Sequence, residues 1–300
     1  MWFEFMTETA YGSQHTLPRT YLNAWRDPGT PNSAYVWVFS RDGTGGHYSA
    51  PKKLFAEEDF YTKIDEHGAR DLSLEHALRE VEDRFAKLRD ALLVPEEPVT
   101  LEEGAYIVEF MLAMSFRTAA HRERRRNEWR NALTTMLEAQ KRAGTDEHGR
   151  PPTVRYSFSP DPKHPSLSVQ DVQRLIDTPI QHAFSIEMAT YLPIMTGMNM
   201  LVLRTNDEPG FITSDDPCVW INKEINQGPP ALAALGDFGI LMPLSPCQIM
   251  FLNPFTSGYS KAGPNMVDEF NRITREHAHQ EIVVSRNQTR GVWFDASADS

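Results

Sequence analysis

Cysteine is nearly absent from this 300-residue chain, which contains only Cys218 and Cys247. Two cysteines cannot form a disulfide framework or, by themselves, a cysteine-rich zinc site. Free cysteine is commonly a core residue, so we interpret both as small buried side chains.

Long apolar runs are also lacking. Every apolar stretch is interrupted by Glu, Arg, Asn or Pro within about 10 residues, whereas a helix needs about 20 to cross a bilayer. The start, Met1-Trp2-Phe3-Glu4-Phe5-Met6, carries neither the basic nor the apolar region of a secretion signal. We therefore expect a cytoplasmic protein with no membrane contact.

Basic charge is in deficit. The chain has 41 acidic and 30 basic residues, a formal net charge of -11 that repels nucleic acid on average. The dense basic run is Arg122-Glu123-Arg124-Arg125-Arg126. On a helix it spreads around the circumference and reads as a solvated face paired with acids, although a nucleic-acid backbone could dock there. The expected partner is an unidentified small molecule or a nucleic acid.

Recognised catalytic patterns are missing. There is no HExxH, GxSxG, CxxC or Walker sequence. His277 and His279 are two residues apart, so on a helix they would point to different faces and make a poor metal pair. No enzyme class follows from motifs alone.

What the chain does contain is periodic apolar spacing. It predicts a strand at 35–39, a helix at 73–93 with Ser73 as N-cap, and a longer helix from the Thr100–Glu103 capping box to Gly144. A third helical region opens at Ser168 and is kinked or divided by prolines. Runs at 200–203, 218–221, 238–244 and 248–252 read as an antiparallel sheet, followed by a helix at 267–280 and a strand at 282–285.

This order segregates helices from strands and predicts an α+β fold, with a helical subdomain packed on a mainly antiparallel sheet. We expect a single integrated domain at 13–286. An N-terminal extension at 1–12, a proline-rich surface loop at 145–165 and a C-terminal tail at 287–300 complete the chain.

Short segments in a fixed order carry a family resemblance. They are H-x-x-P-x-x-Y-L at 15–22, A-E-x-x-F-Y at 56–61, R-T at 117–118, F-I-T-S-D-x-P at 211–217 and P-L-S-P at 243–246. Together they resemble a bacterial family known as domain of unknown function 4238, whose usual Asn is replaced here by Asp216. The matches run from about residue 14 to 286, which implies one integrated domain and implies no activity.

Ionisable residues within these segments are the candidate site: His15, Glu57, Glu82, Arg117 and Asp215. Histidine is suited to act as acid, base or metal ligand near neutral pH, but His15 could equally cap a turn. Glu82 shares a helix face with Glu75, seven residues earlier, and both side chains could face the protein or the solvent.

Arg117 is flanked by apolar residues, and a partly buried guanidinium needs carboxylates or a bound anion. It could clamp a structural acid such as Asp215 or Glu82, or hold the phosphate or carboxylate of a substrate. His121, four residues later, lies on the same helix face and could join it. Asp215 could close an Asx turn or, with Glu57 and Glu82, bind a divalent metal ion.

Two hypotheses therefore remain open. In one, the protein is a metal-dependent hydrolase or nuclease acting on a phosphodiester. In the other, it is a non-catalytic binding or sensor protein, such as a component of a phage-defence or toxin locus, and the same residues form a structural ion-pair network. Both require the candidate residues to meet in space.

Overall fold

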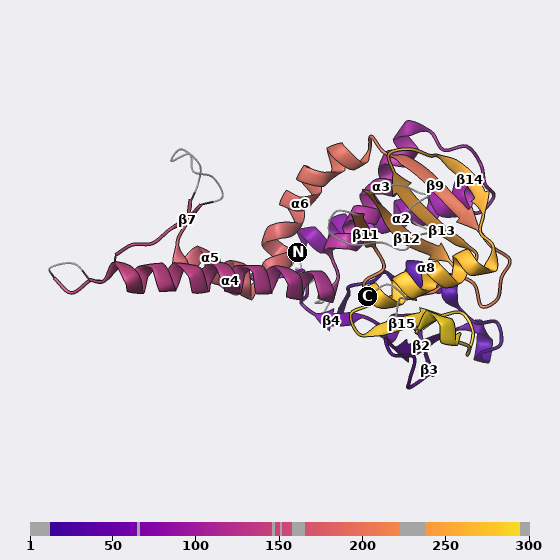
Figure 1. Cartoon of the computed structure of the whole chain (residues 1–300), viewed down its shortest axis with the longest axis horizontal. Coiled ribbons are helices and arrows are strands. Elements are labelled where there is room, and N and C mark those ends of the chain that lie inside the picture. The colour runs from indigo at the N-terminus through magenta and orange to yellow at the C-terminus, as the bar shows by residue number, and fades with distance from the viewer. Residues whose placement is uncertain are drawn as a thin grey trace, which may run out of the picture.

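Helices and strands segregate in space as they do along the chain (Figure 1). The computed structural model describes residues 13–64, 67–145, 148–150, 152–157, 166–222 and 238–294. The helices are α1 (Arg19–Leu22), α2 (Ser73–Leu88), α3 (Leu101–Phe116), α4 (Ala119–Ala143), α5 (Val169–Asp177), α6 (Pro179–Met195) and α8 (Pro264–His277). The expected N-terminal extension at 1–12 lies outside the described residues.

A large sheet has the order β11–β12–β13–β9–β14. Its strands are β9 (Asn199–Arg204), β11 (Val219–Asn222), β12 (Phe238–Ser245), β13 (Gln248–Asn253) and β14 (Gly258–Lys261). Neighbours are antiparallel except β14, which runs parallel to β9. With the helices, this confirms the α+β fold with a mainly antiparallel sheet.

Both faces of the large sheet are covered. Val202 and Met250 belong to the same buried cluster as α2, α3 and α6, whereas Leu201 and Ile249 pack with the apolar face of α8. Since successive side chains of a strand point to opposite faces, a sheet covered twice needs apolar residues at every position. This explains why β9, β12 and β13 appear in the sequence as largely apolar runs, unlike the edge strand β14.

A second sheet has the order β10–β15–β2–β3, with all pairs antiparallel. Its strands are β10 (Thr213–Ser214), β15 (Glu281–Val284), β2 (Val36–Ser40) and β3 (His47–Ser49). Two-stranded pairs are β1 (Ser13–His15) with β4 (Ala56–Glu58), β5 (Lys63–Ile64) with β6 (Arg70–Asp71), and β7 (Tyr156–Ser157) with β8 (Ser166–Leu167). This sheet thus joins an early segment of the chain to a late one, because β15 lies beside β2.

The predicted long helix from Thr100 to Gly144 is wrong in one respect. The Thr100–Glu103 capping box is present, but the helix ends at Phe116, and α4 begins after Thr118. Thr118 has an extended backbone, and its hydroxyl accepts a hydrogen bond from the backbone N–H of His121 at 3.1 Å. A new N-cap therefore divides the predicted helix into α3 and α4.

Two smaller expectations also need correction. Cys218 is buried as expected, but Cys247 is exposed in the turn between β12 and β13. Ser73 is the first residue of α2 instead of its N-cap, and its backbone N–H donates to the Asp71 carboxylate at 2.9 Å.

In the region assigned to the tail, Trp293 is fully buried and donates to Asp268 at 2.7 Å. Among the described residues, no helix is both long and apolar enough to cross a bilayer.

The arm is defined as the outer part of α4 together with α5, β7 and β8, which extend away from the body (Figure 1). Met136, Val172 and Ile176 form a buried cluster there, separate from the clusters of the body. At 1.5 Å per residue, the 25 residues of α4 span about 37 Å. Most of the predicted 145–165 loop at the arm's tip lies outside the described residues.

Candidate functional site

Three of the predicted site residues, His15, Glu82 and Arg117, lie together, since the first two contact the Arg117 guanidinium. Its guanidinium is 2% exposed and donates to the Glu82 carboxylate at 2.5 Å, the His15 carbonyl at 2.6 Å and the Tyr61 hydroxyl at 3.0 Å. Only the backbone of His15 takes part, since its ring lies 3.2 Å from the Lys52 carbonyl. We define Arg117, Glu82, Tyr61 and the His15 carbonyl as the Arg117 network, which ties β1 and α2 to the junction between α3 and α4.

Burial governs the electrostatics of this network. It opposes the charge of Arg117, but contacts with Tyr61 and Glu82 more than offset this, so the pKa of Arg117 lies above its ordinary value. Burial also raises the pKa of Tyr61 to about 12, against the opposing charge of Arg117. Glu75 is half-buried nearby, and burial raises its pKa as well. Arg117 remains charged and Tyr61 neutral, as a structural clamp requires.

The other two predicted residues lie elsewhere. Glu57 on β4 accepts hydrogen bonds from Arg122 at 2.6 and 3.3 Å. Asp215 follows β10 and accepts backbone hydrogen bonds from His279, Gln280 and Glu281 at 2.8, 2.8 and 3.3 Å. Burial raises the pKa of Asp215, although these N–H groups oppose the shift. Asp215 thereby fastens the start of β15.

Glu57 and Asp215 line one cavity of about 360 Å³, together with Arg122, Glu123 and Glu281. Glu82 is not among its lining residues. The structure therefore brings together two of the three predicted metal ligands and leaves Glu82 with Arg117. Within the described ranges, no group of three or more His, Cys, Asp or Glu side chains is arranged to hold a metal ion.

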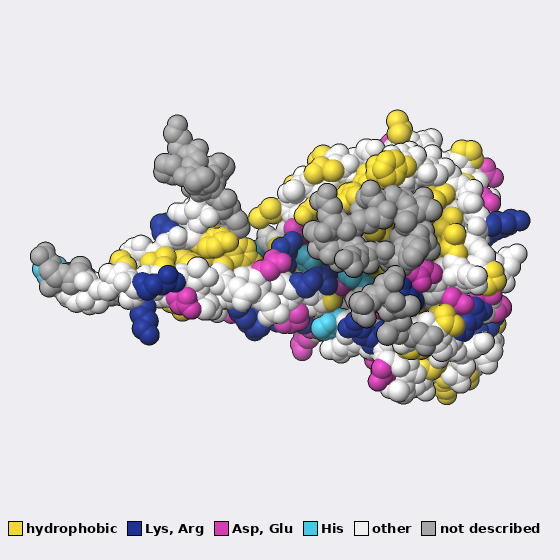
Figure 2. Space-filling model, in the orientation of Figure 1, with side chains coloured by type: hydrophobic (Ala, Val, Ile, Leu, Met, Phe, Trp, Pro, Cys, Tyr) yellow, Lys and Arg dark blue, Asp and Glu magenta, His cyan; other side chains and the backbone are white. Residues whose placement is uncertain are grey.

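A different cavity is lined by both histidine and arginine side chains. It has a volume of about 350 Å³ where α4 joins the body, and we call it the basic pocket. Its lining residues are Ser115, Phe116, His121, Arg124, Arg125, Glu128, Tyr191, Val219, Trp220 and His277. Basic and histidine side chains gather on the surface at this junction (Figure 2). The basic and histidine side chains come from α4 and α8, and the other lining residues come from α3, α4, α6 and β11.

A buried carboxylate supports each histidine of the basic pocket. Glu187, the one acid on α6, lies 2.9 and 3.1 Å from His121 Nε2 and also binds Arg125 at 2.5 Å. Asp216 is 1% exposed and lies 3.1 Å from His277 Nε2 and 2.6 Å from Arg124 Nη1. Each acid therefore lies beside one imidazole and one guanidinium, and a hydrogen bond joins Glu187 to His121.

Thr118 connects this arrangement to the break between α3 and α4. Its hydroxyl donates to Asp216 Oδ1 at 3.0 Å while it caps α4. Burial alone would raise the pKa of Asp216, but His277 and Arg124 hold it below its ordinary value. Similarly, contacts with Glu187 and Glu128 raise the pKa of Arg125 against the effect of burial. These shifts favour the charged forms of the Asp216 carboxylate and the Arg125 guanidinium.

Sequence reasoning reached parts of this pocket without assembling it. His121 was linked to Arg117, the arginine run to nucleic acid, and His277 to an unsuitable metal pair with His279. The sequence does not identify Glu187 as a site residue, because a lone acid on a helix is ordinarily solvent-exposed. The signal that was available is Asp216, which stands where the resembled family has Asn.

The chain matches the family described as protein of unknown function (DUF4238) over residues 13–288, and it belongs to that family. The expectation from the ordered segments is therefore confirmed. No curated protein and no solved structure matches the chain.

Proposed function

We propose that the protein is a hydrolase that acts on a phosphodiester in the basic pocket. The observation that carries the proposal is the convergence of His121 and His277, each beside a buried carboxylate, on one cavity with Arg124 and Arg125. Histidine is the most frequent general acid and base, and arginine matches the geometry of phosphate oxygens. A carboxylate behind an imidazole orients the ring and stabilises its protonated form.

The reaction follows from these roles. Water attacks phosphorus, and one imidazole accepts its proton while the new P–O bond forms. The other imidazole, protonated beforehand, donates a proton to the leaving oxygen as the ester P–O bond breaks. Arg124 and Arg125 stabilise the negative charge that grows on the remaining phosphate oxygens. The enzyme regains its starting state by exchanging protons with water.

The overall charge bears on the size of the substrate. A net charge of -11 repels long polyanions, whereas a pocket of about 350 Å³ accommodates a small phosphodiester. The sequence also suggested a divalent ion held by Glu57, Glu82 and Asp215. The mechanism in the basic pocket uses no such ion, so metal dependence becomes one comparison in the test.

The test is hydrolysis of bis(p-nitrophenyl) phosphate, measured as the release of p-nitrophenolate. The rate is measured once in EDTA and, separately, in Mg²⁺. His121→Gln and His277→Gln should each lower the rate by about 10²–10⁴-fold, the usual contribution of a general acid or base. His76→Gln, at an exposed position on α2, is the matched control. Activity in EDTA supports the two-histidine mechanism, and a wild-type rate in both pocket variants would refute it.

A non-catalytic role is the second candidate, and the Arg117 network favours it. Arg117 is buried and its guanidinium is fully engaged by groups of the chain itself. Part of the predicted site therefore acts as the structural ion-pair network of that hypothesis. A binding or sensor protein would show a higher thermal midpoint in inorganic phosphate, dependent on Arg124 and Arg125, without cleaving any phosphodiester.

A further inference from the structure

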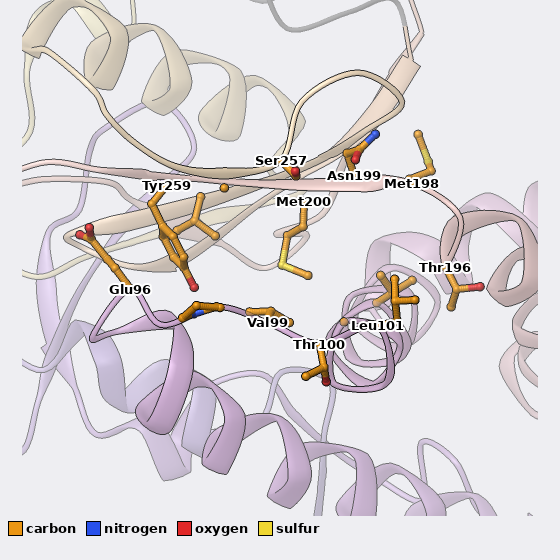
Figure 3. A pocket seen from close by; sticks show the side chains of 15 residues that line it. Glu96, Val99, Thr100, Leu101, Thr196, Met198, Asn199, Met200, Ser257 and Tyr259 are labelled. Carbon is orange, nitrogen blue, oxygen red and sulfur yellow. The ribbon is translucent and has the colours of Figure 1, made fainter.

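A third ligand-sized cavity lies between the start of α3 and the strands β9 and β14 (Figure 3). Its volume is about 420 Å³, within the range of about 300–1,000 Å³ that is typical of small-molecule sites. It shares no lining residue with the basic pocket. In Figure 3, Met200 and Tyr259 extend from the strands towards Val99, with Leu101 beside them.

Apart from Ser257, the polar side chains of this cavity are already engaged. Glu96 pairs with Arg204 at 2.9 Å, the Tyr259 hydroxyl donates to the Glu97 carbonyl at 2.8 Å, and Thr100 donates to Glu103 at 2.7 Å. Asn199 likewise donates to the Pro254 carbonyl at 3.0 Å, and Thr196 to the Pro193 carbonyl at 3.3 Å. The remaining lining is largely apolar and includes Val99, Val108, Met198, Met200 and Val202. A ligand would therefore meet apolar contacts and few unpaired polar groups.

Gly104 keeps the cavity open. It lies within α3, where glycine is less favourable than alanine. A Cβ atom at this position would have ordinary contacts, 3.9 Å from both Met200 Cε and Val99 Cγ1. Close packing therefore does not require glycine here, and a larger side chain would occupy the space.

An apolar side chain of the cavity lining faces solvent. Leu101, a lining residue, is 95% exposed. Val94, Ile194 and Phe255, all exposed, lie within two residues of lining residues in the sequence. Exposed apolar side chains around a concave site are typical of a place where an apolar partner binds.

We infer that this cavity binds an uncharged, mainly apolar small molecule, either an aliphatic chain or a ring. Engaged polar groups disfavour a charged ligand, because its charge would lose water without gaining a partner. Two methionines supply flexible, polarisable walls that adapt to an apolar shape. The site is independent of the phosphodiester proposal, since it uses different residues and a different chemistry.

The test is a fluorescence titration of the full chain with Nile red, an uncharged apolar dye, and displacement of the dye by decanol. Gly104→Leu fills the cavity and should weaken Nile red binding at least tenfold, with Gly104→Ala intermediate. Both changes suit a helix, so the thermal midpoint should hold or rise. Ile186→Ser, which removes an exposed apolar side chain outside the cavity, is the control and should bind as the wild type does.

Sedimentation with phosphatidylcholine vesicles distinguishes a free apolar small molecule from the acyl chain of a membrane lipid. Decanol displacement without vesicle binding indicates a free small molecule, and vesicle binding that Gly104→Leu abolishes indicates a lipid chain. Should Gly104→Leu fail to fold, Gly104→Ala and Val99→Phe carry the comparison. Equal Nile red binding by the wild type and the folded cavity variants, or no displacement by decanol, would overturn the inference.

Discussion

Arg117 shows how a single buried charge is accommodated. Its guanidinium contacts a carboxylate, a phenol and a carbonyl, which come from α2, the segment after β4, and β1. Removing one partner of such a pair leaves the other charge buried and unpaired, and this cost exceeds the net contribution of the intact pair. The contacts of Arg117 therefore assign it a role in the stability of the fold.

We expect Arg117→Met to lower the free energy of unfolding by about 3 kcal/mol, because Glu82 loses its partner and two further hydrogen bonds are lost. Urea denaturation followed by circular dichroism measures the change. Arg142→Met is the matched control, since Arg142 and its partner Glu138 are both mostly exposed, and it should change stability by less than about 0.5 kcal/mol. Equal effects of the two variants would contradict the role given to Arg117.

Asp216 predicts a pH dependence with a definite sign. Its folded-state pKa lies below the ordinary value of 3.8, so its stabilising effect is complete above pH 3.8 and is lost as the pH falls through the folded-state pKa. Asp216→Asn should therefore be less stable than the wild type at neutral pH. The difference in thermal midpoint between the two proteins should narrow below pH 3.8. Thermal midpoints measured from pH 3 to pH 7 test this, and a gap that stays constant over the range would count against it.

At the scale of elements, the break between α3 and α4 decides where the basic pocket forms. If the helix continued through Thr118, the residues of α4 would follow the axis of α3. The N-cap turns the chain there and attaches it to Asp216. One hydroxyl thus sets both a helix start and the position of a pocket carboxylate.

Thr118→Ala should lower the free energy of unfolding by about 2 kcal/mol, the sum of a lost N-cap and a lost hydrogen bond to a buried carboxylate. It should also reduce phosphodiester hydrolysis, since Asp216 loses one of the groups that position it. Thr134→Ala is the control, because the Thr134 hydroxyl bonds only to the Arg130 carbonyl on an exposed part of α4. A Thr118→Ala protein as stable as Thr134→Ala would exclude this role for the cap.

For the whole molecule, local patterns predicted the elements and distant contacts decided the site. Apolar spacing identified α2, α8 and most strands of the large sheet, because the spacing depends on neighbours in sequence. It could not separate two sheets, since the partner of β15 is β2, from the other end of the chain. Nor could it reveal that Glu187 faces His121, because that pairing depends on how α6 crosses α4.

The arm is stabilised by its own cluster, so it should respond to mutation separately from the body. Met136→Ala removes the side chain at its centre and should accelerate amide hydrogen exchange in α5 and α4 beyond Trp129, while β12 and β13 keep their protection. Hydrogen exchange with mass spectrometry measures both regions at once. Uniform acceleration across the whole chain would show that the arm and the body unfold together.

One helix links the arm to the basic pocket. The first turns of α4 carry His121, Arg124 and Arg125, its outer turns form the arm, and neither glycine nor proline interrupts residues 119–143. A rod without a hinge transmits rotation along its length, so a force applied at the tip reaches the imidazole of His121 with no joint to absorb it. Mechanically, α4 is a lever whose short end lies among the ionisable groups.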